Sequence, residues 1–300
     1  MCRLTLLAPF ALLLFWLTSC GLSEPSSAVP TQSTAYIENK GSDTIVNLAL
    51  AWAERYQAGH PDVRISVTGG GSGTGIAALI NGTVDVANAS RQIKPEEMRE
   101  AQANGIQPVE FVIARDAIAV IVHPENPVSQ LTLQQISAIY SGEFNNWLEV
   151  GGEDRPIVRL SRETNSGTHV YFLEMVVRLG DKNNKTLFSM DTLLLPSSEG
   201  IVNEVRQNPN AIGYDGLGYV PPDLRMIAVS PSAEASFVLP SIATVNDGSY
   251  PIARDLYMYT AGEPTGAVKA YLEWILSAEA QAIVAELGFV PISLTPRPSP

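Results

Sequence analysis

Cysteine and histidine are scarce in this chain of 300 residues. Its two cysteines, Cys2 and Cys20, lie among the first twenty residues, so the rest of the sequence holds no thiol that could form a disulfide. The three histidines, His60, His123 and His169, are far apart in the sequence and have none of the spacings of a zinc site. The scarcity of cysteine and histidine excludes a fold that is stabilised by disulfide bonds and a metal centre that is built from histidines.

Basic side chains are outnumbered as well. The chain has 19 Lys and Arg against 31 Asp and Glu, a formal net charge of −12 at pH 7, which argues against nucleic acid as a partner. Hydrophobic residues make up 45% and charged residues 17% of the chain, an ordinary globular composition that is long enough for two α/β domains. Because the net negative field repels anions, a site for an anionic ligand has to depend on local donors.

The beginning of the chain has the pattern of an export signal. Arg3 precedes an apolar run from Leu6 to Leu17, which is shorter than the roughly 18–20 residues of a transmembrane helix. Residues 17–20, Leu-Thr-Ser-Cys, resemble the lipobox of bacterial lipoproteins, which implies a signal peptide over residues 1–19 and a lipid on Cys20. Plain secretion with Cys20 as a free thiol is the alternative. We expect an exported protein, lipid-anchored to the outer face of the cell membrane or located in the periplasm.

Two segments lack the apolar side chains of a folded core. Residues 20–35 are rich in Ser, Pro and Thr, which is typical of a flexible tether. Residues 296–300 contain enough proline to predict a disordered tail. The folded part of the chain is therefore expected between these segments.

Strand and helix patterns alternate along that folded part. The apolar periodicity predicts strands at residues 63–67, 84–88, 109–114, 117–122, 157–160 and 211–213. It predicts helices at residues 44–58, 76–80, 95–103, 133–140, 168–179, 199–207, 267–276 and 278–287. This order is typical of an α/β fold with parallel sheets, in which binding residues lie at the carboxyl ends of the strands.

An arginine stands four residues before a Ser-Gly-Thr sequence at one of these strand ends. Arg162 follows a predicted strand, and Ser166, Gly167 and Thr168 lie at the start of the next helix. A guanidinium, two hydroxyls and free backbone N–H groups would then converge, which is how a protein holds a tetrahedral oxyanion without a metal. A plain ion pair between Arg162 and Glu163, or another surface carboxylate, is the alternative.

A glycine-rich cluster lies at a second turn from strand to helix. Residues 69–75 have the sequence Gly-Gly-Gly-Ser-Gly-Thr-Gly. The cluster lacks the lysine of a P-loop, which argues against a nucleoside triphosphate as the ligand. A tight turn with no ligand is the alternative. Together with the Arg162 segment, the cluster indicates a site built from two sides.

Four segments in this order resemble the phosphate-binding proteins of bacterial ABC transporters. They are residues 41–44, 68–75, 81–91 and 162–168, to which 213–214 and 250–254 can be added. The similarity therefore extends over most of the chain, from Tyr36 to Leu294.

The resemblance implies the type II periplasmic-binding-protein fold, an α/β fold of two domains. Each domain has a mainly parallel sheet flanked by helices. Domain I comprises residues 36–114 and 238–295, and domain II comprises residues 115–237. Two crossing segments, near Ala114 and Phe237, join the domains, and a desolvated phosphate lies in the cleft between them.

The resemblance also implies which residues bind phosphate. Arg162 is the charged fork, Ser166 and Thr168 are hydroxyl ligands, the Gly167 N–H is a backbone donor, and Ser72 supplies another hydroxyl. The complete set is Ser42, Asp43, Thr44, Ser72, Gly73, Thr74, Ser90, Arg91, Arg162, Ser166, Gly167 and Thr168.

Two members of this set have alternative roles. Some proteins of the family carry an aspartate at the position of Arg91, where it accepts the proton of the phosphate. Arg91 is therefore either a phosphate contact or the partner of a neighbouring carboxylate. Asp43 either accepts that proton or serves as the N-cap of the helix that begins at Thr44.

The same residues favour a binding protein over an enzyme. No Gly-x-Ser-x-Gly elbow surrounds Ser72 or Ser166, and His169 points away from its neighbour Thr168 if both lie on a helix. We expect no catalytic residue, no metal and no cofactor; a phosphatase or phosphate sensor of the same fold is the alternative. The implied partners are inorganic phosphate, the permease and ATPase subunits of an ABC importer, and the membrane through the lipid alone.

Overall fold

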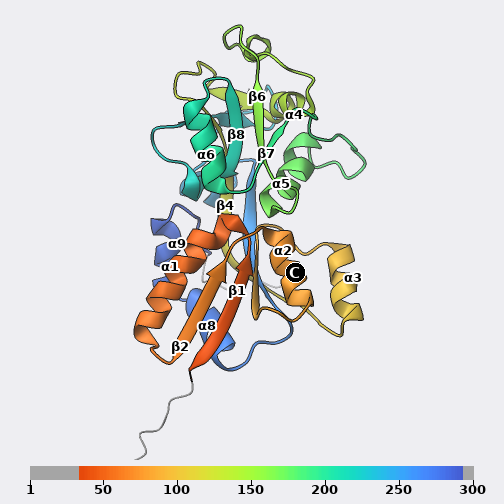
Figure 1. Ribbon diagram of the computed structural model, residues 1–300. Coiled ribbons are helices and arrows are strands. Elements are labelled where there is room, and N and C mark those ends of the chain that lie inside the picture. The colour runs from red at the N-terminus through yellow and green to blue at the C-terminus, as the bar shows by residue number, and fades with distance from the viewer. Residues whose placement is uncertain (1–33, 293–300) are drawn as a thin grey trace, which may run out of the picture. The chain divides into compact units, whose positions relative to one another are not determined.

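The computed structural model describes residues 34–292 of the protein (Figure 1). The expected signal peptide, the lipidated Cys20 and the proline-rich tail lie outside the described residues, as does the tether up to residue 33. Ala35, expected at the end of the tether, instead begins the first strand. None of the described helices is long and apolar enough to cross a membrane.

Most of the described strands belong to one mixed sheet with the order β2-β1-β3-β11-β4-β8-β6-β7, in which β9 also pairs with β4. The strands are β1 (Ala35–Gly41), β2 (Val63–Thr68), β3 (Val86–Ala89), β4 (Val109–Val122), β5 (Gln130–Thr132), β6 (Val158–Arg162), β7 (Leu193–Leu195), β8 (Ala211–Gly216), β9 (Arg225–Met226), β10 (Ala228–Ser230) and β11 (Ala253–Thr260). Strand β1 pairs in parallel with β2 and β3, and β6 pairs in parallel with β7 and β8. Strands β11 and β4 make the antiparallel centre between these parallel pairs.

Helices connect the parallel strands, as the alternating pattern predicted. They are α1 (Asp43–Gly59), α2 (Ser72–Ile80), α3 (Pro95–Ala103), α4 (Leu133–Ser141), α5 (Gly167–Phe172), α6 (Ser198–Gln207), α7 (Ile242–Asn246), α8 (Gly266–Ile275) and α9 (Ala278–Glu286). Helix α5 continues as a π-helix over Leu173–Val177. Helix α4 is capped by Thr132, whose side chain accepts a hydrogen bond from the Gln135 N–H.

Helix α2 begins at Ser72, four residues earlier than the apolar pattern indicated. Glycines weaken a helix, which is why the segment resembled a loop in the sequence. A Cβ on Gly75 would lie 2.5 Å from the Lys40 carbonyl oxygen at the end of β1. Gly75 therefore allows α2 to pack directly on the β1 backbone. This contact outweighs the low helix propensity of glycine.

Strand β4 is a single strand of 14 residues, so the prediction of two strands separated at Asp116 was wrong. It pairs with β11 as far as Ala117 and with β8 from Ile118 onwards. The charged pair Arg115 and Asp116 interrupted the apolar pattern of the sequence. Asp116 is nevertheless buried, because Arg254 is its register partner on β11. Neither β11 nor β1 was expected as a strand.

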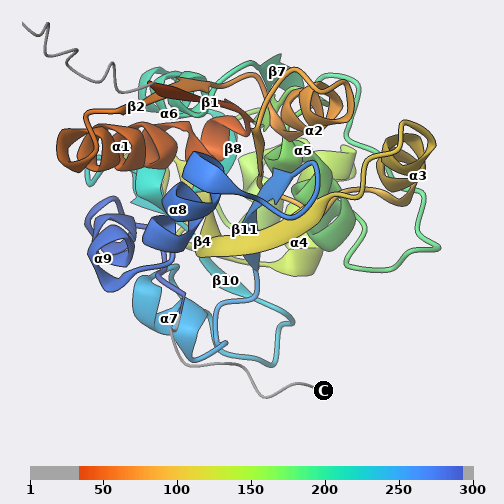
Figure 2. The same cartoon turned by 90° about the horizontal axis from the view of Figure 1, so that it is seen from below.

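Two groups of elements lie on either side of this antiparallel centre, as Figure 1 shows. The β1 group consists of β1, β2, β3, α1, α2, α3, α8 and α9, and the β8 group consists of β6, β7, β8, α4, α5 and α6. Figure 2 shows α1, α8 and α9 on one side of the first group and α2 with α3 on the other. Each group has its own apolar core, around Trp52 and Tyr271 in the first and around Tyr140, Phe172 and Tyr214 in the second.

Candidate functional site

Three serines of the β1 group lie at the carboxyl ends of its parallel strands. Ser42 follows β1, Ser72 is the first residue of α2, and Ser90 follows β3, and all three are buried. The Ser90 N–H donates to Ser72 Oγ over 3.0 Å, and the two hydroxyl oxygens are 3.3 Å apart. The parallel order brings these strand ends to one edge of the sheet, so residues 18 positions apart in the sequence become neighbours.

The β8 group supplies the Arg-x-x-x-Ser-Gly-Thr segment. Arg162 is the last residue of β6, and Ser166 is the N-cap of α5, with its hydroxyl accepting from the Thr168 N–H at 3.2 Å. Gly167 and Thr168 are the first residues of α5. The predicted turn from strand to helix is therefore confirmed, one residue earlier than expected.

The two groups meet at these hydroxyls. Thr44 Oγ1 and Thr168 Oγ1 are 2.8 Å apart, although the residues are separated by 124 positions. A Cβ on Gly167 would lie 2.4 Å from Ser72 Oγ and 2.5 Å from Ser90 Oγ, so only a glycine fits there. The side chains of Thr44, Ser72, Ser90 and Thr168, together with the Gly167 backbone, form the cluster that we call the hydroxyl cluster.

Arg162 is 1% exposed and lies between acidic and hydroxyl side chains. Its Nη2 is 2.5 Å from Asp43 Oδ2, and its Nη1 donates to Ser198 Oγ at 2.8 Å and lies 3.7 Å from Asp215 Oδ2. Of the carboxylates considered for Arg162 from the sequence, Glu163 makes no ion pair with it among the described residues, whereas Asp43 does. The Arg162 Nε has no partner among residues 34–292, and a buried donor of this kind is costly unless a ligand accepts from it.

Asp43 does not cap α1, so that interpretation of the sequence was wrong. It is the first residue of the helix, and Ser42 holds the N-cap position without a side-chain capping bond. The Asp43 carboxylate instead pairs with Arg162 and accepts a weak bond from the Gly70 N–H at 3.4 Å. This carboxylate therefore connects α1 of the β1 group to β6 of the β8 group.

Arg91 pairs with a neighbouring carboxylate, the second of the two roles considered for it. Its guanidinium donates to both carboxylate oxygens of Glu97, at 2.8 and 2.6 Å. Burial acts to raise the pKa of Glu97, but the hydrogen bonds from Arg91 and from the Lys94 N–H outweigh it and hold that pKa below its usual value. The Nε of Arg91 remains without a partner in the described part of the chain.

Two buried carboxylates stand beside the cluster, on neighbouring strands. Asp116 on β4 and Asp215 on β8 are both inaccessible to solvent. Burial raises the pKa of Asp116 to about 6, although the guanidinium of Arg254 at 3.1 Å opposes the rise. Burial also raises the pKa of Asp215, against the opposing effect of Arg162. In each pair the arginine opposes the effect of burial on the pKa of the carboxylate.

Arg254 is the main residue of this region that the sequence analysis did not assign to the site. It lies on β11, is 7% exposed, and donates to Thr168 Oγ1 at 2.8 Å and to the Ser90 carbonyl at 2.8 Å. The sequence did contain evidence for Arg254, because residues 250–254 are among the segments that resemble the family. Without β11 in the predicted fold, however, nothing placed Arg254 beside the hydroxyls.

Two predicted residues use their polar groups outside the cluster. The Thr74 hydroxyl donates to the Gly70 carbonyl at 2.7 Å on the exposed side of α2. The Gly73 N–H donates to the Asn165 carbonyl at 3.0 Å, which is a contact between the two groups. Asn165 also donates to the Gly70 carbonyl at 2.9 Å, so the glycine loop and the Arg162 segment are joined directly.

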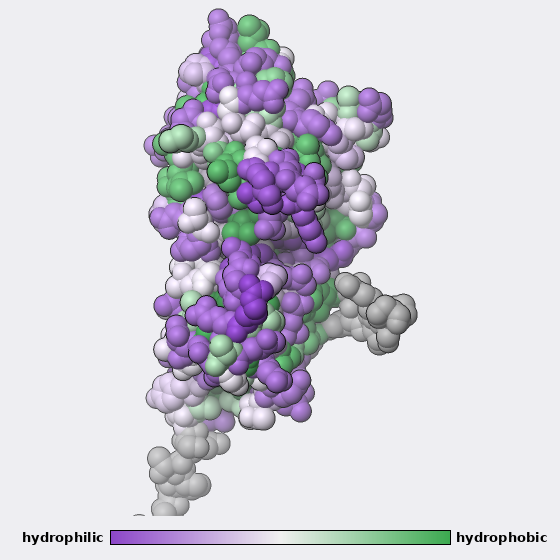
Figure 3. All heavy atoms as spheres, turned by 90° about the vertical axis from the view of Figure 1, so that its right-hand side faces the viewer, coloured by the Kyte–Doolittle hydropathy of each residue, from purple (hydrophilic) through white to green (hydrophobic). Residues whose placement is uncertain are grey.

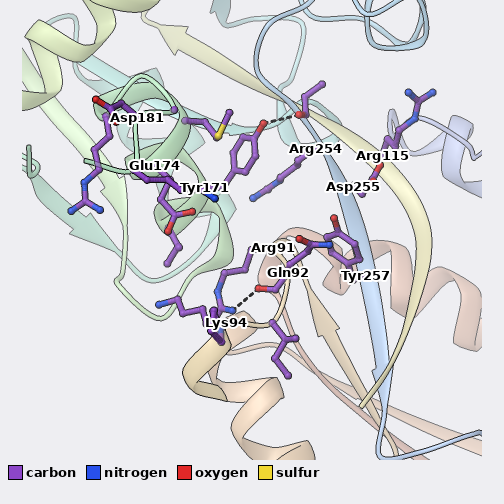
Figure 4. A pocket seen from close by; sticks show the side chains of 18 of the residues that line it. Arg91, Gln92, Lys94, Arg115, Tyr171, Glu174, Asp181, Arg254, Asp255 and Tyr257 are labelled. Atoms are coloured by element: carbon purple, nitrogen blue, oxygen red, sulfur yellow. Dashed lines mark hydrogen bonds between the residues drawn. The ribbon is translucent and has the colours of Figure 1, made fainter. Parts of the chain in front are cut away.

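A cavity of about 920 Å³ lies next to the hydroxyl cluster (Figure 4). Its basic lining residues are Arg91, Lys94, Arg115, Arg178, Lys182 and Arg254, and its acidic ones are Glu174, Asp181 and Asp255. The residues of the hydroxyl cluster are not part of this lining. Figure 3 shows mainly hydrophilic residues on the face that carries α3 and α5. The described residues contain no group of His, Cys, Asp and Glu that could hold a metal ion.

Comparison with known proteins identifies the family. The model of the PBP superfamily domain matches residues 28–279. The phosphate-binding proteins PstS of Pseudomonas aeruginosa and Bacillus subtilis are 32% and 30% identical to this chain, covering 85% and 84% of it and 83% and 79% of their own length. A solved structure from Clostridium perfringens, assigned to a phosphate ABC transporter substrate-binding protein with bound phosphate, has a TM-score of 0.76 and 33% identity, and the match covers 86% of this chain and 100% of that one.

These matches confirm the type II periplasmic-binding-protein fold that the sequence implied. The chain belongs to the PBP superfamily and, within it, to the family of phosphate-binding proteins named PstS.

Proposed function

We propose that this protein captures inorganic phosphate in the hydroxyl cluster and delivers it to an ABC importer. The observation that carries the proposal is the convergence of hydroxyls from two separate groups, shown by the 2.8 Å contact between Thr44 and Thr168. Beside them stand Arg162 and Arg91, two buried guanidinium groups whose Nε–H donors have no partner among the described residues. Such an excess of donors suits a small tetrahedral anion.

The mechanism follows from the burial of these donors. A closed site removes water from the anion, so each hydrogen bond gains strength while the ligand loses its hydration. Discrimination between phosphate and other anions then depends on whether every buried donor and acceptor is paired, since an unpaired group costs on the order of 1–3 kcal/mol. The net charge of −12 makes these local donors necessary.

The names of the relatives support binding and transport. The Pseudomonas aeruginosa and Bacillus subtilis relatives are phosphate-binding proteins, and the Clostridium perfringens structure holds phosphate. These relatives are binding proteins, and no observation favours a phosphatase. We therefore infer a receptor that is not an enzyme, which passes phosphate to the permease and ATPase subunits of its importer.

Calorimetric titration of the purified, ligand-stripped chain with phosphate and with sulfate tests this proposal. We expect saturable binding of phosphate and a clear preference over sulfate. The absence of phosphate binding would overturn it, and release of phosphate from a phosphomonoester would favour the enzymatic alternative instead.

We also infer that the cleft closes on phosphate. The domains are residues 36–114 with 238–295, and residues 115–237, joined near Ala114 and Phe237. The contacts that support closure run between the β1 and β8 groups: the Asp43–Arg162 ion pair and the Thr44–Thr168 hydrogen bond. A ligand that touches both sides favours the closed state through its differential affinity.

The lipid anchor remains a proposal drawn from the sequence. Residues 17–20, Leu-Thr-Ser-Cys, suggest that Cys20 becomes the acylated first residue of an exported protein. Cys20→Ala should release the protein from the membrane fraction or leave its precursor unprocessed, because acyl chains would be the apolar anchor after cleavage. Mass spectrometry of the mature wild-type chain checks this, and an unmodified Cys20 would contradict it.

A further inference from the structure

Arg254 touches both groups of elements and the centre between them. Its Nη2 donates to Thr168 Oγ1 at 2.8 Å, to Asp116 Oδ2 at 3.1 Å and, more weakly, to Thr44 Oγ1 at 3.5 Å. Its Nη1 donates to the Ser90 carbonyl at 2.8 Å. Thr44 and Ser90 belong to the β1 group, Thr168 to the β8 group and Asp116 to β4.

We propose that Arg254 is a positioning residue that holds the hydroxyls of Thr44 and Thr168 so that one of their protons is directed at the ligand. The inference deepens the proposed function and depends on it, because the ligand is the phosphate bound by the hydroxyl cluster. This role is new, because the set of binding residues that the family resemblance implied does not include Arg254.

A count of protons shows how this positioning works. The two threonine hydroxyls carry two protons, and one of these is used in the 2.8 Å bond between their oxygens. A guanidinium has no acceptor atom, so Arg254 takes up lone pairs of these oxygens and cannot receive the second proton. Among the described residues, these two hydroxyls have no other hydrogen-bond partner. The second proton is therefore left for an anion.

The orientation of Arg254 is itself fixed from both sides. Asp116 lies opposite Arg254 in the β4–β11 register, and its other oxygen accepts from the Leu217 N–H at 3.2 Å. Tyr171 of α5 lies under the guanidinium, with its ring centroid 5.5 Å from Cζ, and Figure 4 shows both side chains at the same cavity. A guanidinium held by a carboxylate and a ring has little freedom to move away from the hydroxyls.

A double-mutant cycle with inorganic phosphate as the ligand tests the inference. Calorimetry would be carried out on the full chain as wild type, Arg254→Met, Thr168→Val and the double variant. We expect each single substitution to weaken binding tenfold or more, and the double variant to bind no more weakly than the poorer single variant. Such non-additivity is required if Arg254 acts through the Thr168 hydroxyl, whereas two side chains that act independently give additive losses.

Arg115→Met is the matched control. Arg115 lines the same cavity, but its guanidinium donates to the Val245 carbonyl and to Asn246 instead of the hydroxyls. Its removal should leave phosphate affinity unchanged. Additive losses in the cycle, or an unchanged affinity in Arg254→Met, would overturn the inference.

Failure of the cycle can be told apart from failure of the proposed function, because wild-type protein that binds no phosphate overturns the function itself. If circular dichroism shows that Arg254→Met does not fold, Arg254→Lys replaces it in the same cycle. A lysine keeps the charge beside Asp116, but its compact ammonium lacks the planar fork needed to reach these acceptors together. Non-additive weakening is again expected, and additivity again refutes the inference.

Discussion

At the scale of single residues, the guanidinium of Arg162 interacts with two carboxylates. Asp43 lies 2.5 Å and Asp215 lies 3.7 Å from its guanidinium. Removal of the guanidinium therefore takes away a proposed donor for the ligand and also leaves Asp215 buried without its cation. Breaking a buried pair in this way is strongly destabilising.

Arg162→Ala should abolish high-affinity phosphate binding, with a loss of about 3–5 kcal/mol by analogy with other broken buried pairs. Thermal melting should show a lower stability than wild type, because Asp215 loses its neighbour. Arg206→Ala is the control, since Arg206 forms an exposed pair with Asp223 at 2.7 Å and should change neither property. Wild-type affinity of Arg162→Ala in calorimetry would refute the assignment.

Asp43 lies between Ser42 and Thr44 in the sequence and pairs with Arg162, and it determines the second prediction. Near neutral pH phosphate carries a proton and sulfate does not, so a carboxylate can accept from phosphate while it repels sulfate. Asp43→Asn should therefore lower the preference for phosphate over sulfate tenfold or more, about 1.4 kcal/mol. Parallel titrations with the two anions measure the ratio, and an unchanged ratio would leave Asp43 with its Arg162 ion pair alone.

At the scale of elements, β4 and β11 are the part of the fold that both groups share. Strand β4 changes partner from β11 to β8 between Ala117 and Ile118, directly after Asp116. The buried pair Asp116–Arg254 therefore stands where the two halves of the sheet join. The protonation of Asp116 consequently affects a contact on which the arrangement of both groups depends.

Asp116 should make a visible contribution to the pH dependence of stability. Its pKa of about 6 in the folded chain exceeds the usual 3.8, so the folded chain binds an extra proton between these values. The stabilisation is fully present below pH 3.8 and is lost as the pH rises through about 6. Relative to wild type, Asp116→Asn should therefore lose about 2 kcal/mol more stability at pH 4 than at pH 7.

Urea unfolding of both proteins at the two pH values measures this difference. Comparison of wild type with the variant cancels carboxylates that do not interact with Asp116, such as Glu97, whose pKa is shifted downward. An equal difference in stability at pH 4 and pH 7 would contradict the prediction.

At the scale of the whole molecule, two apolar cores meet across a polar contact. The core around Trp52 and the core around Phe172 are separate clusters, and the contacts between the groups near the site are hydrogen bonds and ion pairs. Polar contacts of this kind can separate without exposing a large apolar surface. We therefore expect the two groups to open and close while each core stays intact.

Phosphate should accordingly make the protein more compact in solution. Small-angle X-ray scattering of the ligand-stripped and the phosphate-saturated chain should show a smaller radius of gyration when phosphate is bound. Sulfate at the same concentration is the control and should have a weaker effect. Identical scattering curves for the free and saturated protein would count against a closing cleft.

The sequence by itself determined the local chemistry of this protein. The helices α3 and α4 and the turns at Ser72 and Ser166 depend on apolar periodicity, capping side chains and glycines, which act over a few residues. The family segments placed the hydroxyl residues at strand ends, and parallel pairing brings such ends together whatever the rest of the sheet does.

Only the tertiary structure decided which charges face one another. The pairs Asp43–Arg162 and Asp116–Arg254 join residues 119 and 138 positions apart, and both depend on the antiparallel pairing of β4 with β11 and β8. No local pattern encodes such pairing, because the free energy of a buried charge depends on the partner that the fold supplies. For the same reason Arg254 acquired a role at the site only when β11 was placed at the centre of the sheet.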